Sequence, residues 1–141
     1  MFGKKYEDRL LEWSEFRQSL EHAQDPIKDV IEFYNVAPTV SIHTDPWDKT
    51  TWPDPWELLE ENQYCDFCRV LGMCYSLQLT DRFNHVPFEI HIVIDNEKSA
   101  TYYLLHVGES VIGYTYGAYC NVNDLPKALH TKKKYSMERL Q

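Results

Sequence analysis

The sequence predicts an α+β domain in which helices come first and an antiparallel sheet follows. Two observations predict this class. Up to about residue 79, apolar side chains recur every three or four positions, as they do on one face of a helix. After Pro87 they alternate with polar side chains, which is typical of a strand with one buried face. The 141 residues contain no internal repeat or Gly/Ser-rich linker, so we expect one domain over residues 1–141.

Each helix has a recognisable start or face. An N-terminal helix is expected within residues 1–24, where an apolar residue recurs about once per turn. Two Asp-Pro pairs open helices over residues 25–35 and 54–59, because aspartate caps a first turn and proline fits its first position. Residues 65–79 carry a broad apolar face and are expected to form a central, buried helix. Gly72 within it suits close packing against a neighbour.

The expected sheet is a three-stranded meander. Strands are predicted over residues 88–94, 101–107 and 110–116, which are rich in Ile, Val, Thr and Tyr. Polar turns at residues 95–98 and 108–109 separate them. With the helices preceding the sheet, this order predicts the α+β class.

Charge and hydropathy exclude several classes of function. The chain has 14 basic and 22 acidic residues and a net charge of -8, which argues against a general nucleic-acid binder. No apolar run approaches the roughly 20 residues that span a bilayer, and the polar N-terminus does not resemble a secretory signal. We therefore expect cytoplasmic synthesis, reduced thiols and no membrane contact.

The charge is unevenly distributed along the chain. Residues 127–141 hold five basic residues and one acidic residue, which leaves a net charge of -12 for the rest. We expect a solvated basic C-terminal tail, with docking on an acidic partner as the alternative.

The four cysteines have different expected roles. Cys68 and Cys74 fit the buried face of the central helix, and Cys120 has no assigned role. Cys65 lies at the predicted start of that helix, where free N–H groups and the helix dipole favour a thiolate. A zinc-binding module using Cys65 and Cys68 is a weaker alternative, because no second ligand pair is present. A thioredoxin-like redox pair is less favoured still, since a helix precedes the CxxC.

A nucleophilic cysteine needs a histidine within hydrogen-bond reach. His91 lies in the first strand, on the face opposite the isoleucines, and a strand packed on the start of the cysteine helix would bring the two together. The alternative is an ordinary half-buried strand histidine.

The order of these features resembles a known superfamily. Trp52-Pro-Asp-Pro-Trp-Glu-Leu-Leu59 precedes Tyr64-Cys-Asp-Phe67, then come a helix and a strand with a histidine. Over residues 25–116 this resembles the transglutaminase-like superfamily of papain-type cysteine folds, especially its short bacterial and tailed-phage members. The resemblance implies that Cys65 is the nucleophile and His91 the general base.

The chain departs from the superfamily pattern at two positions. The place of the orienting acid falls at His106, which lacks a fixed negative charge, and Asp95 and Glu109 are possible substitutes. Asn62-Gln63-Tyr64 replaces the glycine-containing approach to the nucleophile, and Tyr64 is bulky where a close backbone approach is expected.

These departures favour a catalytically silent structural or interaction protein of a larger assembly, such as a virion component of a tailed phage. The alternative is an active thiol hydrolase or acyl-transferase that cleaves amide bonds, for which the candidate catalytic residues are Cys65, His91 and His106. Its substrate would be a peptide or amide, and no cofactor is expected. The clustered Trp47, Trp52 and Trp56 either cap the core or form part of a protein interface. The many tyrosines of the sheet also fit an interface.

Overall fold

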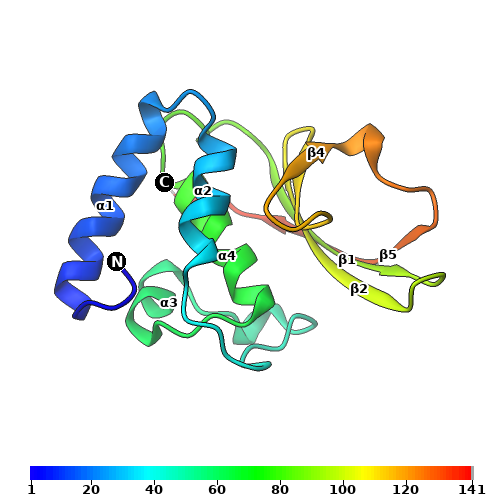
Figure 1. The fold of residues 1–141 in the computed structure, drawn as a ribbon, viewed down its shortest axis with the longest axis horizontal. Coiled ribbons are helices and arrows are strands. Elements are labelled where there is room, and N and C mark those ends of the chain that lie inside the picture. The colour runs from blue at the N-terminus through cyan, green and yellow to red at the C-terminus, as the bar shows by residue number, and fades with distance from the viewer. Residues whose placement is uncertain (141) are drawn as a thin grey trace.

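The computed structural model describes residues 1–140 and confirms the α+β class. Over this part of the chain, four α-helices form one half of the molecule and a five-stranded antiparallel sheet the other (Figure 1). The helices are α1 (Tyr6–His22), α2 (Pro26–Asn35), α3 (Pro55–Glu61) and α4 (Asp66–Gln78). The strands are β1 (Phe88–Asp95), β2 (Ala100–Val107), β3 (Ser110–Ile112), β4 (Tyr119–Asn121) and β5 (Leu129–Met137).

Both predicted Asp-Pro helix starts are confirmed. Asp25 accepts a hydrogen bond from the backbone N–H of Lys28 at the start of α2. Asp54 and Glu57 form a reciprocal capping box at the start of α3, in which each side chain accepts from the other residue's backbone N–H. The local sequence therefore sets these two helix boundaries.

Helix α4 is the buried centre of the helical half, between α2 and the sheet (Figure 1). A Cβ on Gly72 would lie 2.5 Å from Cε1 of Tyr34 in α2, so the glycine allows the close packing that the sequence predicts. The Tyr34 hydroxyl lies 3.0 Å from Oγ of Ser76, which also accepts from Trp13 Nε1 of α1 at 2.9 Å. One hydroxyl on α4 thus joins three helices.

The sheet has the strand order β4-β3-β2-β1-β5. The third strand ends at Ile112, four residues before its expected end, because Gly113 adopts a φ of 112° that turns the chain. The residues that follow, 113–118, form a loop beside α2 and α4.

The basic C-terminal segment is not a solvated tail, which corrects the prediction for residues 127–141. Its residues 129–137 form β5, which pairs with β1 along the whole of that strand. Tyr135 is buried and packs edge-on against Trp52, with ring centroids 4.7 Å apart. Lysines 132–134 stay exposed on what is an edge strand, where lysine suits the solvent-facing side. The lysine run therefore belongs to a strand, and the backbone of this strand forms one edge of the sheet.

Each face of the sheet contributes to a different hydrophobic core. Phe88 and Ile90 of β1 belong to the main core together with the residues of α4. Val93 of β1 packs instead with Leu104 and Val111 in a second, smaller core on the opposite face. Because strand residues alternate between faces, this arrangement determines on which side every polar residue of β1 lies.

No helix within residues 1–140 is both long and apolar enough to cross a membrane.

Candidate functional site

Cys65 occupies the N-cap position of α4, with an extended backbone. The preceding segment is held in place by hydrogen bonds between the backbones of Tyr64 and residues 38 and 40. The Cys68 side chain and the backbone N–H groups of Cys68, His43 and Thr44 lie near the Cys65 sulfur. These donors lower the pKa of Cys65 to about 5, against the opposing effect of burial. The predicted thiolate at the helix start therefore has specific partners.

Cys68 lies one turn further along α4 and is fully buried. Its thiol donates a hydrogen bond to the hydroxyl oxygen of Thr44 at 3.2 Å. The neighbouring Cys65 side chain, and then burial, raise the pKa of the Cys68 thiol well above its ordinary value. The CxxC motif thus contains one thiolate and one protonated thiol in contact.

The structure does not bring His91 to Cys65. His91 shares the face of Glu89 and Val93, which points away from the main core, whereas Cys65 belongs to that core. The residues of this strand that pack in the core with the cysteine helix are Phe88 and Ile90.

On that far face, His91 and His106 stack with ring centroids 3.8 Å apart. Nε2 of His91 lies 2.8 Å from a carboxylate oxygen of Glu89. Burial, and then the neighbouring His91, lower the pKa of His106 to about 4, and its buried Nε2 has no hydrogen-bond partner. The three predicted catalytic residues therefore form a histidine pair and a separate cysteine site.

The two substitute acids have other roles. Asp95 is buried and accepts hydrogen bonds from the backbone N–H groups of Glu97 and Lys98, which holds the turn between β1 and β2. Glu109 is exposed in the turn between β2 and β3.

Tyr103 of β2 does approach the cysteine. Its ring packs edge-on against Phe67, with ring centroids 5.4 Å apart. Burial, and then the Cys65 charge, raise the pKa of Tyr103.

Cys74 and Cys120 both lie away from the Cys65 site, and the described residues offer no ligand group for the zinc alternative. Cys74 is fully buried in α4, and burial raises the pKa of its thiol. Cys120 lies beside the second core, on the other side of the sheet from Cys65. Across residues 1–140, no three His, Cys, Asp or Glu side chains are grouped so that they could hold a metal ion.

The clustered tryptophans differ in burial. Trp52 caps the core, because its ring contacts Phe67 and Tyr135 and its Nε1 donates to the Asp45 carbonyl at 3.0 Å. Trp47 and Trp56 are about half exposed. Only these two are available to a partner.

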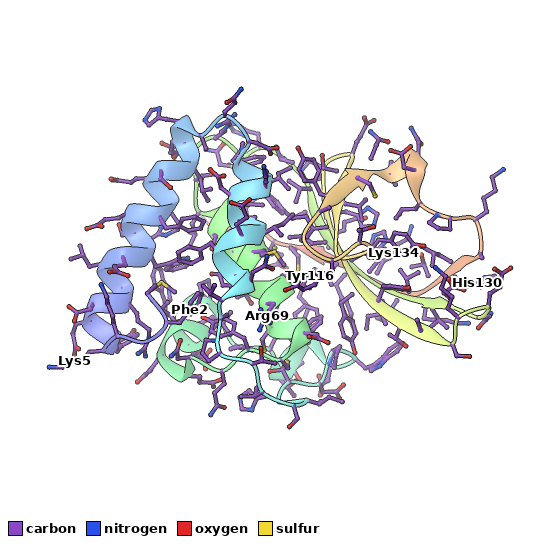
Figure 2. All side chains as sticks on the ribbon, viewed as in Figure 1. Phe2, Lys5, Arg69, Tyr116, His130 and Lys134 are labelled. Carbon is purple, nitrogen blue, oxygen red and sulfur yellow. The ribbon has the colours of Figure 1, made fainter. Side chains whose placement is uncertain are left out.

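A cleft of about 590 Å³ lies between α2 and α4 on one side and β2 with the 113–118 loop on the other. Arg69 and Tyr116 mark this junction in Figure 2. Five tyrosines line it: Tyr34, Tyr102, Tyr103, Tyr114 and Tyr116. From the sequence, the tyrosines of the sheet fit either a solvent-facing sheet or a protein interface. Nothing in the sequence indicated the polar residues that share the cleft, since they come from the helical half.

The two charged residues of the cleft differ in whether their side chains are already hydrogen-bonded. The Arg69 guanidinium is used internally, because it donates to the carbonyls of Tyr34 and Ala37 and to the Thr39 hydroxyl. Asp66 is exposed in the first turn of α4 and lines the cleft. The cleft therefore combines aromatic walls with one solvent-facing carboxylate.

No protein-family model matches the chain, and a search of curated proteins finds no significant match. The resemblance to the transglutaminase-like superfamily stays a prediction.

Proposed function

We propose that this chain is a catalytically silent interaction module of a larger protein assembly, and that it binds an extended peptide segment of a partner in the cleft between α4 and the 113–118 loop. The observation that carries the proposal is the cleft itself. Its volume of about 590 Å³ falls in the range of ligand sites, and its walls are mainly tyrosine and apolar side chains.

The exposed rim of the cleft supports a protein partner. Tyr116 is 89% exposed at a loop between Gly113 and Gly117, both of which have positive φ. A tyrosine presents a large rigid ring and one hydroxyl at little cost in conformational entropy, which is why tyrosine is enriched in binding surfaces. The exposed Tyr116 is therefore suited to close over a bound peptide.

The electrostatics of the cleft favour a basic segment. Asp66 supplies an exposed carboxylate, Arg69 is already paired with backbone carbonyls, and the chain as a whole carries a charge of -8. An aromatic or aliphatic side chain flanked by lysine or arginine is complementary to this lining. We propose this class of peptide as the ligand.

The separation of Cys65 from His91 argues against the amide hydrolase. A cysteine hydrolase needs a base that takes and returns the proton during acyl transfer. The two candidate histidines stack against one another on the far face of the sheet. The silent version of the fold fits this arrangement, as does a place in an assembly such as a phage particle.

A selection experiment tests the peptide-binding proposal. The purified chain is used to select from a display library of short random peptides, and one enriched peptide is synthesised with a fluorophore for anisotropy titration. We expect enrichment of basic residues beside aromatic ones. Asp66→Asn and Tyr116→Ala should each weaken binding about tenfold, which corresponds to about 1.4 kcal/mol.

The matched control is Leu11→Ala, which removes an exposed apolar side chain on α1 outside the cleft. It should leave the affinity unchanged. If the library yields no enriched peptide, or if all three variants bind the selected peptide as the wild type does, the proposal is wrong.

A further inference from the structure

We propose that Cys65 and Cys68 form a peroxide-sensitive thiol pair, which closes to an intramolecular disulfide at the N-terminus of α4. This inference is independent of the cleft. It would stand if no peptide binds, and it would fall if the thiols do not pair.

The geometry of the two residues allows the disulfide. Cys65 is the N-cap and Cys68 lies three positions on, so their side chains meet on one face of the first turn. The Cys68 side chain is also the neighbour that most stabilises the Cys65 thiolate. As an N-cap residue with an extended backbone, Cys65 lies outside the regular helix, which leaves it freer to adjust than an interior residue. A small movement at Cys65 therefore brings the two sulfurs together in a covalent bond.

The surroundings give the two thiols different roles. Backbone N–H groups of α4 and of the loop at residues 43–44 lie near the Cys65 sulfur and stabilise its thiolate, which is the reactive form. Cys68 is fully buried, lies beside the Thr44 hydroxyl and keeps its proton. Cys65 is thus the attacking sulfur, and Cys68 is the thiol that resolves the product.

The chemistry balances with hydrogen peroxide as the oxidant. The Cys65 thiolate attacks one oxygen of the peroxide, the O–O bond breaks, and hydroxide leaves, which produces a sulfenic acid on Cys65. The Cys68 sulfur then attacks the sulfenic sulfur. The S–S bond forms and the S–O bond breaks, and the released hydroxide takes the Cys68 proton as water. The hydroxide released in the first step takes up the proton that Cys65 lost on ionising. In total, the two thiols lose two electrons and one peroxide is reduced to two waters.

Burial selects a small oxidant. Cys65 retains only 4% exposure, which leaves no room for a folded disulfide partner such as an oxidoreductase. Cys74 is fully buried with a raised thiol pKa, and Cys120 lies beyond the sheet. Neither of these two cysteines has the paired thiol that the first turn of α4 provides.

The test uses the full chain, reduced and then treated with hydrogen peroxide in slight excess. The protein is quenched with iodoacetamide under denaturing conditions and analysed by intact and peptide mass spectrometry. We expect a species that has lost two hydrogens and carries two alkyl groups, with a linked peptide pair that contains Cys65 and Cys68. A reductant should restore four alkylated thiols.

Two variants separate the roles of the sulfurs. Cys68→Ser keeps a hydroxyl donor for the Cys65 sulfur but removes the resolving thiol, so Cys65 should stop at a sulfenic acid that dimedone traps. Cys120→Ser should form the disulfide as the wild type does. Circular dichroism verifies that both variants are folded.

Three results would each overturn the proposal: four thiols that stay reduced under peroxide that oxidises free cysteine, a wild-type chain in which Cys65 is oxidised while Cys68 stays free, and oxidation spread evenly over all four thiols.

Discussion

His91 stacks on His106 with ring centroids 3.8 Å apart, on the face of the sheet that points away from Cys65. This contact joins the two histidines that the sequence assigns to a catalytic triad and separates both from its cysteine. The reactive state of Cys65 is instead produced by Cys68 and by backbone N–H groups. The thiolate and the histidine pair are therefore expected to respond independently to mutation.

Replacing His91 should leave the Cys65 thiolate unchanged. In a His91→Gln variant we expect the ultraviolet absorbance of the Cys65 thiolate to titrate near pH 5, as in the wild type, because the Cys68 thiol is the main cause of the low pKa. Cys68→Ala should move the midpoint upward, whereas Cys68→Ser should move it less. A shift in the His91→Gln variant as large as that of Cys68→Ala would mean that the two sites are coupled.

The half-buried ring of His106 should make stability depend on acid pH. Its pKa is lowered to about 4 in the folded protein, against about 6.5 in an unfolded chain. Between these values the unfolded state binds the proton and the folded state does not, so stability is lost as the pH falls from about 6.5 to about 4. We expect His106→Phe, which keeps a ring against His91, to reduce this loss by roughly 2 kcal/mol. Urea unfolding at several pH values measures it.

The matched control for this titration is His130→Gln, at an exposed position of β5. It should retain the wild-type dependence on pH. If His106→Phe follows the wild-type curve as well, the ring of His106 is not the group that titrates.

A side chain at position 72 should disturb the contact between α2 and α4. In Gly72→Ala the new Cβ meets the Tyr34 ring at 2.5 Å, and the hydrogen bond from Tyr34 to Ser76 holds that ring in place. The cost of overpacking should exceed the stability gained from the higher helix propensity of alanine. We expect a net loss of about 1–2 kcal/mol in the free energy of unfolding. Gly3→Ala, where the Cβ meets nothing within 4 Å, is the control for chemical denaturation. A Gly72→Ala variant as stable as the wild type would contradict the close approach.

The C-terminal strand should contribute to stability through its one buried ring. Tyr135→Ala removes contacts with Trp52 and the main core side of β1, and we expect a loss of about 2–4 kcal/mol. Lys132→Ala, at an exposed position of the same strand, should change stability by less than about 0.5 kcal/mol. Thermal unfolding compares the two variants. Equal effects would indicate that residues 129–137 do not pack as a strand.

Local signals in the sequence were sufficient to predict much of the fold. The Asp-Pro pairs mark the starts of α2 and α3 because capping depends on neighbouring residues alone. The alternation after Pro87 marks β1 for a similar reason. The C-terminal strand escaped detection because β5 buries only Tyr135, so its lysines resemble a solvated run. This strand forms because its backbone pairs with that of β1, which is distant in the sequence.

The candidate site divides in the same way. The sequence by itself determined that Cys65 begins a helix, and that His91 and the isoleucines of β1 lie on opposite faces of their strand. Only the tertiary structure decided which face meets α4. The isoleucine face packs there because burying apolar surface lowers the free energy more than burying an imidazole does. That preference leaves the histidines on the far side, brings Thr44 and Cys68 to the thiolate, and opens the cleft between the helices and the tyrosines of the sheet.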